Sequence, residues 1–208
     1  MMKTQHGKVM VHSVLILTVL FAAISGCSKK YVRAEDDPSI DYRAMSLAFD
    51  RRDINHLYDQ VQTELMNSSV VRQWEYEAEN RKAPQVALFP IRNNTSEHIS
   101  AQLDTLLSKF ETDLVNETDA KVVSRERQQE LISEIKKTQQ SDAYNPNSLA
   151  RYGKQLGAQY FLTGKIEDVA ERVDDERRVQ YNLFIQIIDV ETGEIKFQKE
   201  ATVTKALM

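Results

Sequence analysis

The chain has 208 residues and a formal net charge of −4, with 27 lysine and arginine residues against 31 aspartate and glutamate residues. This acidic balance argues against a nucleic-acid partner, because nucleic-acid-binding surfaces carry an excess of basic residues. The single cysteine excludes an internal disulfide, and the six glycines are too scattered to form a glycine-rich phosphate-binding loop.

The beginning of the chain is typical of a bacterial secretion signal. Lys3 and Lys8 precede an apolar stretch over residues 9–24. The stretch ends in the sequence Ile-Ser-Gly-Cys, which resembles the lipobox of bacterial lipoproteins. We therefore expect residues 1–26 to be removed by cleavage between Gly26 and Cys27, leaving Cys27 acylated as the first mature residue. A buried cysteine at the end of a membrane anchor is the alternative.

Removal of the signal would leave 25 basic and 31 acidic residues and a net charge of −6. No second apolar segment approaches the ~20 residues that span a bilayer, so attachment would depend on the lipids of Cys27. Ser28 follows the cysteine, and the usual sorting rule for bacterial lipoproteins then implies the outer membrane, with the protein facing the periplasm. Residues 27–52 are rich in charge and poor in large apolar side chains, which predicts a flexible tether reaching ~25–30 Å on average.

A first helix is predicted from Asp53 to Met66, because Ile54, Leu57, Val61 and Leu65 recur at helical spacing and Asp53 can cap the start. With the connecting segment that follows, it makes up a region from residue 53 to residue 83. Trp74 and Tyr76 lie in that segment, which lacks clean periodicity. They are either exposed aromatic anchors for a partner or side chains packed beneath a linker.

The region from residue 84 to residue 208 is predicted to form a globular domain. Residues 85–91 form a nearly continuous apolar run, as in a strand covered on both faces, and Pro90 must end that strand or face an edge. A helix is predicted from Ser96, a plausible cap, to Leu114, because six apolar residues share one face. These residues are Ile99, Leu103, Leu106, Leu107, Phe110 and Leu114.

Further strands and helices alternate along the rest of this domain. A strand is predicted at residues 121–124, a helix through Ile135 and a second helix from Pro146 to a left-handed ending at Gly157. Three strands then follow in succession, at residues 160–164, 179–187 and 195–201, with a turn at residues 189–194. Helical crossovers imply parallel strands early, and short turns imply an antiparallel meander late. The sequence thus predicts an α/β (α+β) fold, with a mixed sheet of four to five strands flanked by three to four helices.

Several segments, in order, resemble the LpoB family of penicillin-binding protein activators, and the resemblance covers everything after Asp53. In that family an asparagine-threonine pair follows the first strand, as Asn94 and Thr95 do here. The resembling segments are Leu88–Ile99, Val122–Arg125 with Leu131, Gly153–Gly164 and Asp189–Ile195. The third and fourth also resemble the amino-terminal domain of TolB and the curli secretion channel, so the expected fold is TolB amino-terminal-like.

This resemblance implies a regulator of peptidoglycan synthesis that does no chemistry itself. Its partner would be a class A penicillin-binding protein, a bifunctional peptidoglycan synthase. The alternative is a structural or assembly lipoprotein of the envelope, which would associate with itself, whereas an activator is expected to be a monomer. The tether is short and contains only Pro38 as a proline, whereas known family members carry long proline-rich tethers.

A search for catalytic groups leads to the same expectation of no enzyme activity, no cofactor and no metal. His56 and His98 are the only histidines after the signal, and consecutive Ser96, Glu97 and His98 cannot face one another on a helix. An acidic cluster with interleaved arginines predicts a solvated hairpin tip, and calcium binding is the alternative interpretation. Its acidic members are Glu167, Asp168, Glu171, Asp174, Asp175 and Glu176.

The candidate partner-binding residues are Arg92, Asn93, Asn94 and Thr95, together with Trp74. The four-residue loop has two interpretations. It is a turn whose asparagines bond their own backbone and position the next helix, or it contacts the partner directly.

Overall fold

The computed structural model describes residues 35–41, 46–125, 128, 153–173 and 176–207. The chain divides into two compact units, Met1–Tyr42 and Arg43–Met208. The described part of the first unit contains a short 3-10 helix, η1 (Pro38–Asp41), preceded by Asp37, whose carboxylate accepts a hydrogen bond from the backbone amide of Ser39 at 3.1 Å.

Several predicted features lie wholly or mostly outside the described residues. They are the cleavage site at Gly26 and Cys27, the first part of the tether, and most of the two helices predicted from Ser124 to Ile135 and from Pro146 to Gly157, of which the second is described as helical over residues 153–156. Among the helices that the structure does describe, none is long and apolar enough to cross a membrane.

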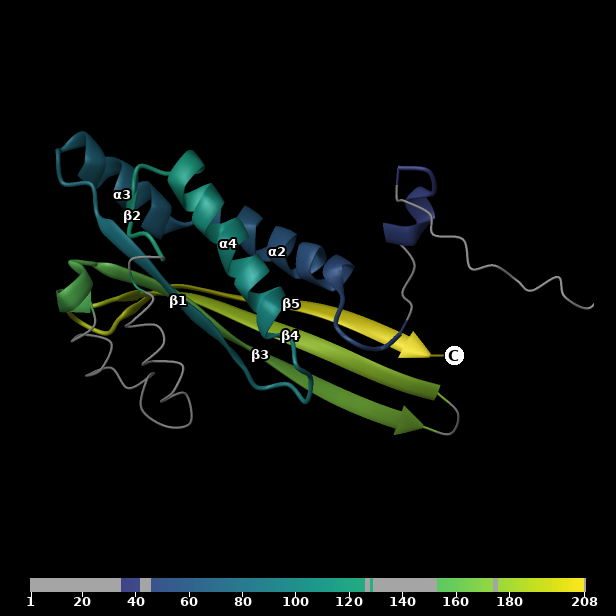
Figure 1. Cartoon of the computed structure of the whole chain (residues 1–208). Coiled ribbons are helices and arrows are strands. Elements are labelled where there is room, and N and C mark those ends of the chain that lie inside the picture. The colour runs from purple at the N-terminus through teal and green to yellow at the C-terminus, as the bar shows by residue number, and fades with distance from the viewer. Residues whose placement is uncertain (1–34, 42–45, 126–127, 129–152, 174–175, 208) are drawn as a thin grey trace, which may run out of the picture. The chain divides into compact units, whose positions relative to one another are not determined.

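The second unit is built on a five-stranded mixed sheet with the strand order β2-β1-β3-β4-β5 (Figure 1). The parallel pairs are β2 with β1 and β1 with β3, whereas β3, β4 and β5 form an antiparallel meander. Both the mixed sheet and its division into early parallel and late antiparallel strands are as the sequence predicts. The strands are β1 (Gln85–Asn93), β2 (Lys121–Val122), β3 (Tyr160–Val173), β4 (Glu176–Asp189) and β5 (Ile195–Leu207).

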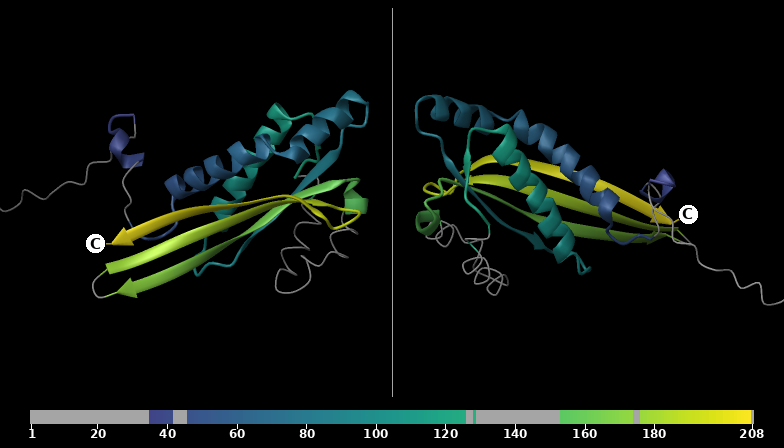
Figure 2. Two further views of the ribbon diagram at one scale, coloured as in Figure 1. Left: turned by 180° about the vertical axis from the view of Figure 1, so that it is seen from behind. Right: turned by 45° about the horizontal axis from the view of Figure 1, so that its top comes forward.

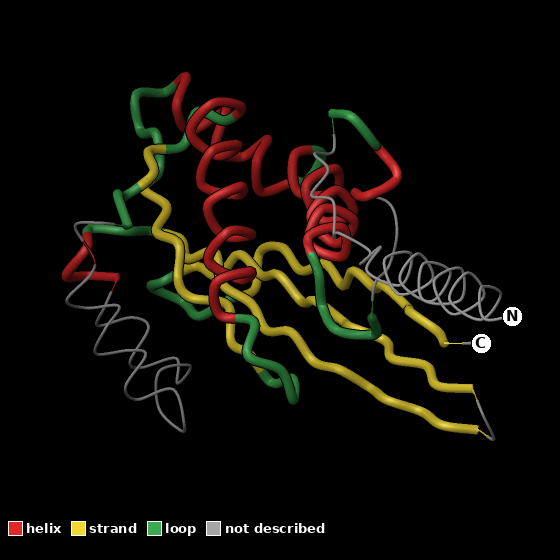
Figure 3. The backbone as a smooth tube through the Cα atoms, turned by 45° about the vertical axis from the view of Figure 1, so that its right-hand side comes forward, coloured by secondary structure: helices red, strands yellow, loops and turns green. Residues whose placement is uncertain are grey.

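Three helices lie on one face of this sheet, as all views show (Figures 1, 2 and 3). They are α2 (Arg51–Met66), α3 (Ser69–Glu79) and α4 (Ser100–Glu117). The predicted apolar stripe of α2 is buried, as is the predicted stripe of α4, whereas Val115 of α4 lies off that stripe and is exposed. Each fully buried apolar side chain contributes about 1.5–3 kcal/mol, so these stripes supply much of the helix-to-sheet packing energy.

The packed domain begins before the predicted boundary at residue 53. Helix α2 starts at Arg51, and its N-cap is Asp50, whose side chain accepts from the amides of Arg52 and Asp53. Asp53 is the third residue of the helix, and its carboxylate accepts from the Asp50 amide to complete a capping box. Phe49 is 5% exposed and belongs to the main core. The end of the predicted tether is therefore part of the domain.

Helix α3 lies in the segment that the sequence left without periodicity. Ser68 caps it, and Val70, Val71 and Trp74 are its buried residues. The Trp74 ring is 0% exposed and lies 5.5 Å from the ring of Tyr160. The interpretation of Trp74 as an exposed anchor is therefore wrong, since its ring fills the core between α3 and the sheet.

Strand β1 is buried on both faces, as predicted. Val86 and Leu88 belong to the core beneath the helices, and Ala87 and Phe89 belong to a smaller cluster on the second face. The strand continues past Pro90 to Asn93, but its register with β3 shifts between Leu88 and Ile91, and β2 pairs only with Gln85 and Val86. Pro90 thus lies where the ladder is interrupted, as its missing N–H requires.

Strand β3 is longer than predicted, because Gly164 does not end it. A Cβ atom at Gly164 would lie 2.2 Å from the carbonyl oxygen of Phe184 on β4, so glycine permits the close approach of the two strands. The strands then run on together to Val173 and Glu176. The left-handed ending at Gly157 is confirmed by its φ of 67°, and the turn after β4 is held by the Asp189 carboxylate, which accepts from the amides of Glu191 and Thr192.

Candidate partner-binding surface

The loop after β1 is an ordered turn built on the side chain of Asn93. The Asn93 Oδ1 atom accepts from the Thr95 amide at 3.0 Å and from the Thr95 hydroxyl at 2.7 Å. Its Nδ2 atom donates to the Glu97 carbonyl at 2.7 Å, and the Glu97 amide donates to Thr95 Oγ1 at 3.2 Å. Asn93 and Thr95 therefore bond local backbone, as the first interpretation of this loop states.

Helix α4 begins after this turn, at Ser100, with Ile99 as a cap that makes no side-chain hydrogen bond. The expectation that Ser96 caps the helix is wrong. Its amide and hydroxyl donate instead to Asp168 of β3, at 3.3 and 3.0 Å. The turn extends the chain by several residues before the helix can start, and so removes Ser96 from the capping position.

The loop is also joined to β3 beside it. The Asn94 amide donates to the Ile166 carbonyl at 2.9 Å, and the Asn94 side chain donates to Glu167 Oε1 at 3.1 Å. Lys165 donates to the same Glu167 oxygen at 2.7 Å. These hydrogen bonds from Lys165 and Asn94 hold the pKa of Glu167 below its usual value. The end of β1 and the middle of β3 thus form one polar surface.

A hollow of about 360 Å³ adjoins this surface on the second face of the sheet, opposite α2 and α4. Arg92 is one of its lining residues, paired in register with Lys165. Its remaining lining residues come from β3, β4 and β5 and are Thr163, Gly164, Lys165, Phe184, Gln186, Ile188 and Gln198.

The hollow combines an apolar ring with cations and with an unmet hydrogen-bonding group. The Lys165 ammonium lies 4.9 Å from the centroid of the half-buried Phe184 ring. Thr163 is 2% exposed, and its Oγ1 has no hydrogen-bond partner among the described residues. Leaving a buried hydroxyl unpaired is unfavourable, so the Thr163 hydroxyl needs a hydrogen-bond partner that the described residues do not supply.

The other residues considered from the sequence occupy separate places. His56 is exposed on α2 and His98 is exposed before α4. The Glu97 carboxylate bonds the Tyr181 hydroxyl and the Phe49 amide. Hence Ser96 and Glu97 each have partners other than His98, and the three do not form a catalytic relay.

The acidic cluster lies partly on strands and partly outside the described residues. Glu167, Asp168 and Glu171 belong to β3, Glu176 begins β4, and Glu171 is paired with Arg178. Within the part of the chain that the structure describes, no group of three or more histidine, cysteine or acidic side chains is placed to hold a metal ion.

Comparison with known proteins identifies one family. A family model described as the peptidoglycan-synthase activator LpoB matches residues 53–203. No curated protein matches the chain.

Solved structures with similarity to the chain include two carboxyl-terminal domains of LpoB. The domain from Salmonella enterica is 17% identical with a TM-score of 0.48, and the match covers 72% of this chain and 96% of that one. The Escherichia coli domain is 16% identical with a TM-score of 0.47 over the same shares of the two chains. Lipoprotein GNA1162 from Neisseria meningitidis is 11% identical with a TM-score of 0.43, and the match covers 59% of this chain and 83% of that one.

Proposed function

The chain belongs to the LpoB family of peptidoglycan-synthase activators, as its motifs predict, and we propose that it binds and activates a class A penicillin-binding protein without catalysing a reaction itself. The observation that carries this proposal is the family match over residues 53–203, which extends from the first turn of α2 into β5. A protein that activates by binding must have higher affinity for the active conformation of its partner.

The partner contact is proposed for the surface formed by the loop after β1 and the hollow on the second face of the sheet. Arg92, near the end of β1, lines the hollow, and Asn94 is exposed beside it, so we assign these two residues to the contact with the synthase. Asn93 and Thr95 act by holding the turn. Lys165 lies over Phe184 and donates one of its three N–H groups to Glu167, so with Arg92 beside it the surface fits a partner that presents a carboxylate next to an apolar side chain.

Anchoring through an acylated Cys27 to the outer membrane, facing the periplasm, completes the proposal. About 18 residues separate Cys27 from Ser46, where the described part of the domain begins, and such a segment spans about 60 Å when fully extended. The tether therefore holds the beginning of the domain within about 60 Å of the anchor, and the extent of the domain adds to the reach of its binding surface. Mass spectrometry of the amino-terminal peptide from membrane fractions would identify the lipids, and an unmodified or uncleaved peptide would contradict this part of the proposal.

The functional test uses purified residues 28–208 with class A synthases from the same organism. We expect the protein to be a monomer in sedimentation, to bind one of these synthases and to speed its glycan polymerisation. Absence of both binding and stimulation with every such synthase would refute the proposal. Stable self-association without stimulation would instead favour the alternative of a structural or assembly lipoprotein.

A further inference from the structure

The residues just before α2 form an arm, Ser46–Asp50, that is held against the end of the sheet. Phe49 is its buried residue, and the Phe49 ring meets the Tyr181 ring edge to face, with centroids 5.1 Å apart. The chain that leads back to Cys27 joins the domain at this arm. Any force along that connection therefore acts on the arm first.

Two side chains from different parts of the domain hydrogen-bond successive arm residues, and the hydroxyl of a third lies beside the arm residue that precedes them. The Phe49 amide donates to Glu97 Oε2 at 2.9 Å. The carbonyl oxygen of Leu47 lies 3.0 Å from the Tyr181 hydroxyl, and the carbonyl of Ala48 accepts from the Lys205 ammonium at 2.7 Å. The arm is thus fixed through its backbone as well as through the Phe49 ring.

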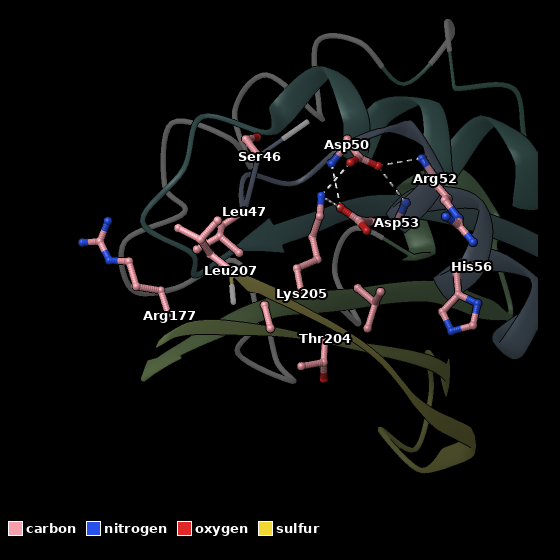
Figure 4. Close-up of a pocket in the computed structure, with 12 residues that line it drawn as sticks. Ser46, Leu47, Asp50, Arg52, Asp53, His56, Arg177, Thr204, Lys205 and Leu207 are labelled. Atoms are coloured by element: carbon pink, nitrogen blue, oxygen red, sulfur yellow. Dashed lines mark hydrogen bonds and ion pairs between the residues drawn. The ribbon is translucent and has the colours of Figure 1, made fainter. Parts of the chain in front are cut away.

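Lys205 joins the arm to the start of α2. Its side chain extends from β5 toward Asp50 and Asp53, beside a pocket of about 770 Å³ (Figure 4). The ammonium donates to Asp50 Oδ2 at 2.6 Å and to Asp53 Oδ2 at 2.9 Å, in addition to Ala48. All three N–H groups of this buried cation are therefore occupied. Displacing the arm would remove two of its three acceptors.

Glu97 belongs both to this arm contact and to the candidate partner-binding surface. Its carboxylate bonds the Phe49 amide and the Tyr181 hydroxyl, the latter at 2.6 Å. Its backbone carbonyl accepts from the Asn93 side chain, the contact that closes the turn after β1. Because one residue makes both sets of contacts, a shift of Glu97 when the arm opens would also disturb the Asn93 bond that closes the turn.

We infer that the arm and the Asn93–Glu97 turn form one cooperative unit, in which docking of the arm holds the partner-binding surface in its binding-competent form. This inference rests on the proposed function, since it concerns the regulation of that same surface. A pull on the chain between Cys27 and the arm then weakens synthase binding. The apparent dissociation constant rises in inverse proportion to the docked fraction, so a tenfold fall in that fraction lowers affinity tenfold.

Hydrogen exchange in residues 28–208 alone, without any synthase, tests the coupling. Phe49→Ala removes the ring contact of the arm, and Lys205→Met removes the arm contacts together with the bond to Asp53 on α2. The control Lys199→Met lies on the same strand as Lys205 and removes the ion pair with Glu64 on α2. We expect the two arm variants to raise exchange at the Thr95 and Glu97 amides at least tenfold more than at amides of the central β3–β4 ladder, which report global unfolding, and the control to leave this ratio unchanged. Faster exchange at Phe49 in Lys205→Met with unchanged exchange at Thr95 and Glu97 would overturn the inference.

The reciprocal experiment starts from the turn and also serves if the arm variants fail to fold. Asn93→Ala removes the side chain that closes the turn and does not touch the arm. Coupling between two sites is reciprocal, so exchange at the Phe49 amide should rise in this variant. An unchanged Phe49 amide would overturn the inference. A wild-type chain that shows this coupling but binds no synthase would refute only the proposed function.

Discussion

The side-chain amide of Gln60 on α2 bonds both backbone polar groups of Thr202 on the edge strand β5. Its Nε2 donates to the Thr202 carbonyl at 3.1 Å, and its Oε1 accepts from the Thr202 amide at 3.4 Å. An uncovered edge strand is a template for pairing with another chain. Gln60 therefore occupies two backbone groups in the middle of β5 that would otherwise be open to such pairing.

Replacement of this glutamine tests its protective role. In Gln60→Ala the N–H and C=O groups of Thr202 lose their partner, and we expect the free energy of unfolding to fall by about 1 kcal/mol. Denaturant titration measures this change, and sedimentation at increasing concentration should show association only in the variant. Equal stability and equal sedimentation of the two proteins would show that the edge does not need Gln60.

Lys205→Met should be among the most destabilising single changes. It leaves the Asp53 side chain, which is 5% exposed, without its counter-charge. Removing one partner of a buried ion pair costs about 3–5 kcal/mol. Urea unfolding of this variant and of Lys199→Met, whose ion pair is more exposed, provides the comparison. A loss of less than 1 kcal/mol in Lys205→Met would contradict the buried pair.

Stability should depend on pH through Asp50. Burial raises its pKa, but hydrogen bonds from Lys205 and from the amides of Asp53 and Arg52 outweigh this effect and hold the pKa below the ordinary value of 3.8. A carboxyl group with a lowered folded-state pKa stabilises the fold above its unfolded pKa, and this contribution is lost as pH falls through the folded value. Stability should therefore decline below about pH 4.

Asp50→Asn keeps an N-capping side chain but cannot ionise, so it isolates this effect. We expect the variant to be less stable than the wild type at pH 7 and to lose less stability on acidification. Denaturant midpoints measured between pH 3 and pH 7 give both curves. Parallel curves would show that Asp50 does not contribute to the acid dependence.

Trp74→Ala should reduce stability without a specific effect on binding. Truncation of a fully buried tryptophan costs about 3–5 kcal/mol through lost packing and the cavity that remains. Affinity for the synthase, measured at a temperature where the variant is still folded, should equal that of the wild type. A large loss of affinity in a folded variant would show that Trp74 contributes to synthase binding, either by direct contact or by holding the contact surface in shape.

Local patterns were sufficient to predict most of the sheet and the helices α2 and α4. The alternation in β4 and the apolar stripes of the helices are periodic along the chain, so each can be read without knowing its neighbours. Helix α3 was missed because only Val70, Val71 and Trp74 of its residues are buried, which gives a short and weak stripe. Its spacing of three and four residues before Trp74 was the available signal.

Features that depend on distant residues could not be predicted from local sequence. Gly164 resembles the end of a strand, and only its approach to Phe184 on β4 explains why the strand continues. The docking of the arm could not be predicted either, because Phe49, Glu97 and Tyr181 are far apart in the chain and come into contact only in the folded domain. The candidate loop was located from sequence, but the hollow beside it requires the register of β3 with β4.

The rate of glycan polymerisation by the cognate class A synthase, measured with and without residues 28–208, tests the proposed activation most directly. Lys165→Glu reverses a charge at the hollow, and Lys82→Glu makes the same change at an exposed site before β1. We predict that the wild type and Lys82→Glu stimulate the synthase equally and that Lys165→Glu needs at least tenfold more protein, a loss of about 1.4 kcal/mol. No stimulation by the wild type, or equal stimulation by a folded Lys165→Glu variant, would contradict activation through this surface.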